Sequence, residues 1–181
     1  MRVGVADHLG WAVLVTADEQ HRVIDRRRIE LVGEGLSAAP IHYDRGERDD
    51  AAMAALIDEV RASITVTAGA ELDALANALP RPVRSLHLRT WPTDLPTDLA
   101  TLRRAPWEAR IDAIRYREVL AELADERGWE VVTYEAKRVE ADVAARLADR
   151  ADEVLLGPKA VLGAPWGKDQ RVALAATVVG A

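Results

Sequence analysis

The N-terminal stretch decides the fold, and it reads Arg2-Val3-Gly4-Val5-Ala6-Asp7-His8-Leu9-Gly10-Trp11-Ala12-Val13-Leu14-Val15. Its first part is small and apolar, which is typical of a buried strand. Asp7 and Gly10 bracket a turn, because Asp suits the first position of a type I turn and Gly suits a left-handed residue at its end. Residues 11–16 predict a second strand. The chain therefore opens with a hairpin that has a carboxylate at the end of its first strand.

The rest of the first half continues this meander and then becomes helical. A third strand is expected over residues 21–32, and short turns join all three strands, which indicates an antiparallel arrangement. A loop with several glycines follows over residues 33–48. Apolar residues then recur at helical spacing over residues 50–79. Pro80 and Pro82 end that helix.

The second half alternates strands and helices. The expected elements are a strand over 83–88, a proline-rich loop over 91–107, a helix over 108–127, a strand over 129–134, a short helix over 139–147 and a last helix over 168–179. This order predicts an α/β fold with a mixed five-stranded sheet, three antiparallel strands being followed by strands parallel to the first. Helices are expected on both faces, and residues 1–181 are expected to form a single domain.

Composition excludes several classes of function. The hydrophobic content of 49% and the charged content of 30% fit an ordinary globular protein. A net charge of −6 argues against a dedicated nucleic-acid coat or a membrane-surface binder. The lack of cysteine removes disulfides, thiolate metal sites and cysteine nucleophiles. No apolar run approaches the roughly 18 residues that span a bilayer, and no signal-peptide layout is present. The expectation is a cytoplasmic protein without a membrane partner.

Common enzyme signatures are also missing from the sequence. It contains no glycine-rich phosphate loop of the Walker or dinucleotide type, and no G-x-S-x-G serine elbow. Its four histidines lack the H-x-x-x-H spacing of a zinc site.

Two motifs at opposite ends of the chain carry a resemblance. The first is Val3-Gly4-Val5-Ala6-Asp7 with Gly10, and the second is Trp166-Gly167-Lys168-Asp169-Gln170-Arg171-Val172-Ala173-Leu174-Ala175-Ala176. With the order of elements, they resemble the ribonuclease H-like superfamily, and within it the branch of RuvC-type resolvases. In that branch the last acid stands at the start of the final helix, ahead of an alanine-rich turn, and Asp169 occupies such a place. The resemblance in topology spans nearly the whole chain.

The resemblance implies a nuclease or phosphotransferase that depends on Mg²⁺ or Mn²⁺ and acts on nucleic acid. Such enzymes hold two divalent ions roughly 3.5–4 Å apart, one to activate water and one to stabilise the leaving oxygen. It implies that Asp7 and Asp169 bind the metals and that Asp94 is the third catalytic acid. The residues that would contact the substrate are His87, Arg89, Arg104, Arg110 and Tyr116.

The sequence departs from the family at one place. The family has an acid at or just past the strand over 83–88, where this chain has His87, Arg89 and Thr90. Three alternatives follow: the loop supplies Asp94, His87 substitutes for the acid, or the metal site is incomplete. The last alternative predicts a non-catalytic binding or homo-oligomerisation module, with the helix over 50–79 and the tryptophan-containing loops as its contact surface. An unrelated α/β enzyme is a third hypothesis.

Each candidate residue also has an ordinary structural interpretation. Asp7 suits a turn that closes a hairpin, and Asp169 suits the first turn of a helix, where a negative charge complements the macrodipole. His87 is then a half-buried, hydrogen-bonded histidine. The run of arginines over 26–28 either meets phosphates or protects an edge strand from aggregation. The arginines of the helix over 108–127 either line a polar cleft or form a solvated face with ion pairs.

Overall fold

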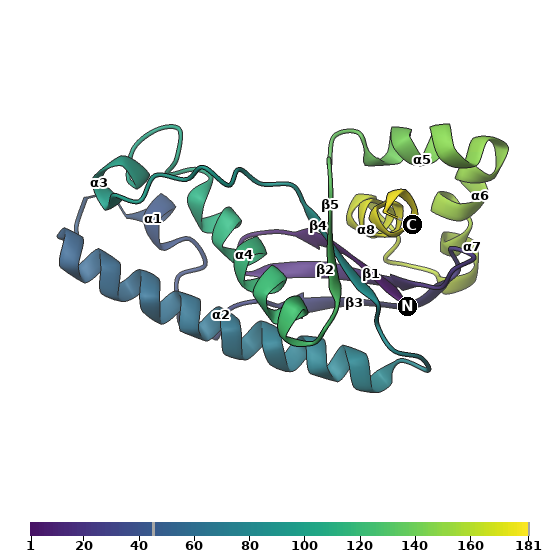
Figure 1. Cartoon of the computed structure of the whole chain (residues 1–181), viewed down its shortest axis with the longest axis horizontal. Coiled ribbons are helices and arrows are strands. Elements are labelled where there is room, and N and C mark those ends of the chain that lie inside the picture. The colour runs from purple at the N-terminus through teal and green to yellow at the C-terminus, as the bar shows by residue number, and fades with distance from the viewer. Residues whose placement is uncertain (45, 181) are drawn as a thin grey trace.

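A five-stranded sheet forms the centre of the computed structural model, which describes residues 1–44 and 46–180. Its strands are β1 (Arg2–Asp7), β2 (Trp11–Ala17), β3 (Val23–Glu30), β4 (Ser85–Arg89) and β5 (Glu130–Tyr134). They lie in the order β3-β2-β1-β4-β5. The first three strands are antiparallel, while β4 is parallel to β1 and β5 is parallel to β4. The mixed sheet predicted from the sequence is therefore confirmed (Figure 1).

Helices follow the strands in the expected order, with several additions. They are α1 (Pro40–Tyr43), α2 (Asp50–Ala78), α3 (Leu99–Leu102), α4 (Ile111–Glu126), α5 (Val139–Leu147), α6 (Ala151–Leu156), α7 (Pro158–Leu162) and α8 (Lys168–Val179), with a 3₁₀ turn at Ala148–Arg150. The sequence predicted α2, α4, α5 and α8 but not the four shortest helices. Two of these short helices are capped by aspartates. At α1, Asp112 of the distant helix α4 accepts hydrogen bonds from the amides of Ile41 and His42, and at α3 the adjacent Asp98 is the cap.

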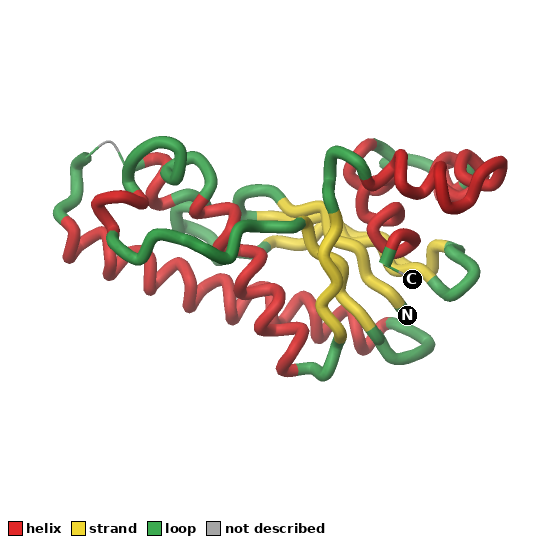
Figure 2. The backbone as a smooth tube through the Cα atoms, turned by 45° about the horizontal axis from the view of Figure 1, so that its top comes forward, coloured by secondary structure: helices red, strands yellow, loops and turns green. Residues whose placement is uncertain are grey.

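The two faces of the sheet are covered by different helices. α2 and α4 pack on one face, where Val3, Val5 and Leu14 belong to the same buried cluster as Leu72 and Leu120. α5, α6 and α8 pack on the other face. Successive residues of β1 point to opposite faces, as the two-residue period of a strand requires. Figure 2 shows the sheet between these two layers, so the prediction of helices on both faces is confirmed.

A strand and a helix approach each other closely at Gly4. A Cβ atom on this residue would lie 1.8 Å from the carbonyl oxygen of Ala173 in α8. Only a residue without a side chain allows β1 and α8 to pack at this distance. The contact places α8 directly on the strand that ends at Asp7.

No helix among residues 1–44 and 46–180 is long and apolar enough to cross a membrane. The expectation that residues 1–181 form a single domain stays a prediction.

Candidate functional site

The site predicted from the sequence is centred on Asp7, at the carboxyl end of β1. Asp7 is only 4% exposed. Its Oδ2 accepts a hydrogen bond from Nε of Arg117 at 2.8 Å, and its Oδ1 lies 3.9 Å from Nε of Arg89. Asp7 is therefore buried between two guanidinium groups, one from α4 and one from the end of β4.

The fold positions both arginines for this contact. β4 is parallel to β1 and adjacent to it, so Arg89 at the end of β4 lies beside Asp7 at the end of β1. Arg117 lies one helical turn from both Ile114 and Leu120, on the buried face of α4. Its guanidinium carries the charge that neutralises the carboxylate of Asp7 in a place that water does not reach.

Tyr134 of β5 adds a further buried polar contact beside Asp7. Its hydroxyl donates a hydrogen bond to the carbonyl of Val5 at 2.6 Å. Burial raises the pKa of Tyr134 well above its ordinary value, and the negative charge of Asp7 raises it further. The phenol therefore stays protonated and acts as a fixed hydrogen-bond donor.

Asp169 lies at the start of α8 and contacts the residue next to Asp7. Its Oδ2 is 3.2 Å from Nε2 of His8. His8 stacks on Trp11, with ring centroids 4.0 Å apart and an angle of 9° between the planes. The guanidinium carbon of Arg28 lies 4.6 Å from the centre of the Trp11 ring. The end of β1 and the start of α8 therefore converge, as the resemblance implied.

The third predicted acid lies in a different setting. Asp94 is exposed, in the loop between β4 and α3. The neighbouring acid of this loop, Asp98, accepts a hydrogen bond from the amide of Thr101 at 2.8 Å and so caps α3. Within the described part of the chain, no group of three or more His, Cys, Asp or Glu side chains has the arrangement of a metal site.

These residues do not fit a pair of divalent ions. Mg²⁺ and Mn²⁺ need several oxygen ligands that are not already engaged by other side chains. Asp7 is bound by Arg117, and Asp169 is 3.2 Å from the imidazole of His8. A cation next to Asp7 would also be repelled by two guanidinium groups.

Two of the residues predicted to bind substrate lie in the interior. His87 is fully buried, and its Nε2 is 2.8 Å from the hydroxyl of Ser85. Burial, with a smaller effect from Arg2, lowers the pKa of His87 to about 4, so the ring is neutral near neutral pH. Tyr116 is also fully buried and donates a hydrogen bond to the carbonyl of Ala38 at 2.9 Å. Neither side chain reaches the surface, so neither one touches a substrate in this structure.

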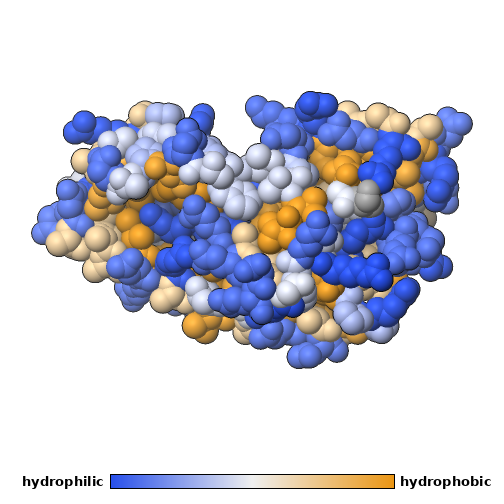
Figure 3. Space-filling view, in the orientation of Figure 1, coloured by the Kyte–Doolittle hydropathy of each residue, from blue (hydrophilic) through white to orange (hydrophobic). Residues whose placement is uncertain are grey.

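The other three predicted substrate contacts are accessible. Arg104 and Arg110 are exposed between α3 and the start of α4, and neither pairs with an acidic residue in the described chain. The side chain of Arg89 is 39% exposed. Their roles in substrate binding stay predictions. Figure 3 shows a notch between the lobe that contains α1 and α3 and the lobe that contains α5.

The arginine run over residues 26–28 is used within the fold. Arg27 forms an ion pair with Asp25 and Arg28 with Glu30. Arg26 donates hydrogen bonds to backbone carbonyls at the end of α7, among them that of Gly163 at 2.9 Å.

Reasoning from the sequence did not identify Arg117 as the partner of Asp7. A signal was present, because Arg117 falls at helical spacing between the apolar residues Ile114 and Leu120. An arginine on a buried helix face requires a buried acid nearby. Asp7, at the end of a buried strand, is the acid that the fold provides.

Comparisons with known proteins support the fold. No protein-family profile matches the chain, and no curated protein matches it. Two solved structures of RuvC from Thermus thermophilus are similar to it. The one in complex with a Holliday junction substrate has a TM-score of 0.54 and 15% identity, covering 98% of this chain and 90% of RuvC. The other has a TM-score of 0.51 and 14% identity, covering 98% of this chain and 91% of RuvC. The chain therefore has the ribonuclease H-like fold that its sequence predicted.

Proposed function

We propose that this chain is a non-catalytic, ribonuclease H-like module that binds nucleic acid. The observation that carries the loss of catalysis is the buried ion pair between Asp7 and Arg117. The guanidinium of Arg117 is bound to Oδ2 of the carboxylate, and that of Arg89 lies 3.9 Å from Oδ1, so both oxygens face a positive charge of the protein. The positive charge that a nuclease takes from metal ions is thus supplied by the protein itself.

The energetics of this pair favour a permanent structural role. Removing a carboxylate and a guanidinium from water costs several kcal/mol per ion, and only a well-formed pair offsets that cost. Replacing Arg117 by a hydrated divalent ion would leave the guanidinium buried without its partner. The carboxylate of Asp7 therefore stays bound to Arg117.

Nucleic acid is proposed as the partner from the likeness in fold and from the exposed cations. The RuvC structure with the same fold is in complex with a Holliday junction substrate. In this chain, Arg89 lies at the carboxyl end of β4, and Arg110 immediately precedes α4. Arg110 is exposed and forms no ion pair among the described residues, and the side chain of Arg89 is 39% exposed beside Asp7. Both guanidinium groups are accessible to phosphates.

A metal-dependent nuclease is the second candidate, and one observation favours it. Asp169 lies within 3.2 Å of the residue that follows Asp7, and Oδ1 of Asp7 accepts no hydrogen bond from the described residues. This candidate requires Arg117 and Arg89 to withdraw from Asp7 when a metal and the substrate bind.

The test combines binding and cleavage of a four-way DNA junction with Mg²⁺ or Mn²⁺ present. We expect the wild type to bind the junction without cleaving it. The variants Arg89→Gln and Arg110→Gln should each bind more weakly and reduce the salt dependence of binding by about one counterion. The control is Arg81→Gln, which removes an exposed charge after α2 and should bind like the wild type.

Two results would contradict the proposal in different ways. Cleavage by the wild type that is lost in Asp7→Asn would establish the nuclease. Absence of binding to the junction, to duplex DNA and to single strands would remove nucleic acid as the partner.

A further inference from the structure

The end of the sheet opposite Asp7 contains a pocket. It lies between the turn that joins β2 to β3 and the α6–α7 segment, and it has a volume of about 700 Å³. We propose that this pocket binds a small amphipathic monoanion, a carboxylate with an apolar chain, whose carboxylate lies between Arg150 and His21. This proposal is independent of the proposed function.

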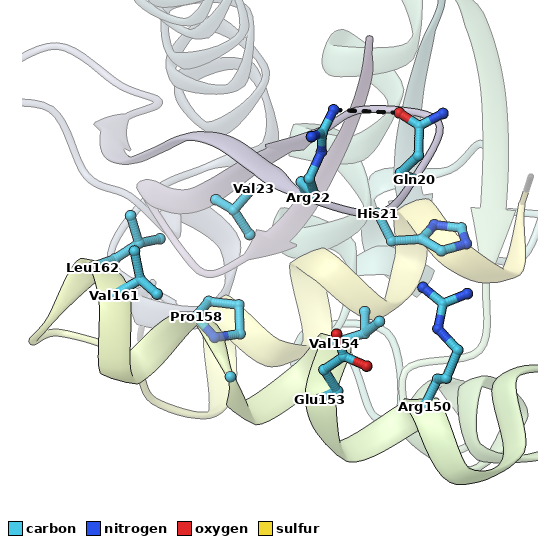
Figure 4. A pocket seen from close by; sticks show the side chains of 11 residues that line it. Gln20, His21, Arg22, Val23, Arg150, Glu153, Val154, Pro158, Val161 and Leu162 are labelled. Carbon is cyan, nitrogen blue, oxygen red and sulfur yellow. Dashed lines mark hydrogen bonds between the residues drawn. The ribbon is translucent and has the colours of Figure 1, made fainter.

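One end of the pocket is apolar (Figure 4). Val23 of β3 and Val154 of α6 line it together with Pro158, Val161 and Leu162 of α7. Val161 is 85% exposed, although it is a large hydrophobic residue. The volume falls in the range of about 300–1,000 Å³ that is common for small-molecule sites with a mainly apolar lining. An aliphatic chain in this end would cover apolar surface that now faces water.

The other end of the pocket is cationic. Figure 4 shows the side chains of His21 and Arg150 pointing toward each other from opposite walls. No acidic side chain of the described residues forms an ion pair with Arg150, whereas the neighbouring Arg22 is paired with Asp18 at 2.8 Å. Glu153 also lines the pocket and adds a negative charge. One unpaired guanidinium beside a glutamate suits a single negative charge better than the double charge of a phosphate.

His21 is held at the pocket in an unusual backbone conformation. Its φ angle is 64°, in the left-handed region that residues other than glycine seldom adopt. The buried Asp18 fixes the turn, because its Oδ1 accepts hydrogen bonds from the amides of Gln20 and Arg22, both at 2.9 Å. Strain of this kind is concentrated at functional sites. A glycine would relieve it but would remove the imidazole from the pocket.

The charge state of His21 fits the role of a neutral donor. Burial lowers its pKa, and the positive charges of Arg2, Arg150 and Arg146 lower it further. Its Nδ1 lies 3.5 Å from a guanidinium nitrogen of Arg2. Because a guanidinium only donates, Nδ1 is the accepting nitrogen, and Nε2 carries the proton. That N–H group is available to a carboxylate oxygen.

The far wall of the pocket is anchored to the sheet. Arg26 of β3 donates hydrogen bonds to the carbonyls of Leu162, Gly163, Ala164 and Pro165, which follow one another at the end of α7. This anchor holds α7 against the edge strand. The pocket is therefore formed before a ligand arrives, which lowers the entropic cost of binding.

Calorimetric titration of the full chain with sodium octanoate tests the proposal. We expect saturable binding with one site per chain. Titration with 1-octanol, which has the same chain length without the charge, should give binding about tenfold weaker or none. Inorganic phosphate should not displace octanoate at equal concentration.

Three variants separate the site from nonspecific uptake. Arg150→Gln should weaken octanoate binding about tenfold or more. His21→Gly should also weaken it while keeping or raising the thermal midpoint, which distinguishes a lost contact from a lost fold. The control Arg138→Gln removes an exposed cation that pairs with Asp142 at the start of α5 and does not line the pocket, and it should bind like the wild type. The proposal is overturned if the wild type does not bind octanoate, if octanol binds equally well, or if Arg150→Gln binds as tightly as the wild type.

Discussion

At the carboxyl end of β1, Asp7 lies buried against Arg117, whereas at the opposite end of the same sheet Arg150 lines a pocket without an acidic partner. Both places combine an arginine with a carboxylate or a histidine, and both lie where a strand meets a loop. They differ in one respect: the charge of Asp7 is neutralised by a partner inside the protein, whereas the charge of Arg150 is not paired with an acidic side chain of the described residues.

This difference shows why the position of a residue in a fold does not fix its chemistry. A buried charge must find its partner within the protein, because water is not there to solvate it. Once Asp7 has Arg117, it has little remaining capacity for a metal ion. The exposed Arg150 has no acidic partner among the described residues, so it can still bind an anion, and the apolar wall beside it adds selectivity for one kind of ligand.

The largest effect is expected from breaking the buried pair. Arg117→Met would leave Asp7 charged and buried, and it should lower the free energy of unfolding by about 3–5 kcal/mol. Urea unfolding followed by circular dichroism measures this change. The matched variant at the other end, Arg150→Met, should stay within about 0.5 kcal/mol of the wild type. The double variant Asp7→Asn with Arg117→Met should recover part of the loss. Equal stability of Arg117→Met and Arg150→Met would contradict the comparison.

The next effect concerns the contact that brings α8 to the end of β1. In Gly4→Ala, the new Cβ would lie 1.8 Å from the carbonyl oxygen of Ala173, so α8 must move away from the sheet. We expect a loss of about 3 kcal/mol, at the upper end of the usual cost of overpacking. Chemical unfolding measures it, and nuclear magnetic resonance shifts of His8 report whether its contact with Asp169 is lost. Wild-type stability in this variant would show that the packing of α8 is looser than described.

His87 provides a prediction about pH. Its pKa is lowered to about 4 in the folded protein, against about 6.5 when unfolded. The unfolded chain therefore binds more protons at mildly acidic pH, and the contribution of neutral His87 to stability is complete above about pH 6.5 and declines toward pH 4. Between about pH 7 and pH 5 the free energy of unfolding should fall by about 2 kcal/mol from this residue.

Unfolding curves at several pH values test this prediction. His87→Gln should flatten the decline, while the exposed control His42→Gln should retain it. A decline that is the same in wild type and His87→Gln would assign the pH dependence to other groups.

The smallest effect is expected at Gly69, a buried glycine in α2 outside both ends of the sheet. A Cβ atom there would lie 3.6 Å from Cδ2 of Leu123, an ordinary van der Waals contact. Gly69→Ala should raise the free energy of unfolding by about 0.5–1 kcal/mol, because glycine is unfavourable within a helix. Comparing the free energies of unfolding of Gly69→Ala and Gly4→Ala separates the general effect of adding a methyl group from the specific effect of the close contact between β1 and α8. A loss of stability would show that α2 and α4 pack more tightly than the contact distance indicates.

The mixed sheet, the directions of its strands and the long helices could be predicted because they follow from local patterns and from the order of elements along the chain. The apolar runs of β1 and β2, the Asp7–Gly10 turn and the stops at Pro80 and Pro82 are all visible in the sequence. Two of the missed short helices, α1 and α3, are stabilised by side-chain caps that the apolar pattern does not contain. α1, for example, is capped by Asp112, about seventy residues away along the chain.

The candidate site was predicted in part. The convergence of the two ends of the chain follows from topology, and it is confirmed by the contact between His8 and Asp169. To predict that Arg117 neutralises Asp7, one would have to know which face of α4 is buried and how far the Arg117 side chain reaches. The pocket at His21 and Arg150 joins segments about 130 residues apart, and no local pattern indicates it.

Calorimetric titration of Mn²⁺ into the wild type and into Asp7→Asn tests the central claim most directly. If Arg117 is the permanent partner of Asp7, neither protein will show saturable binding of the ion at millimolar concentration. Saturable binding to the wild type that disappears in Asp7→Asn would show that Asp7 is a metal ligand, and it would contradict the account.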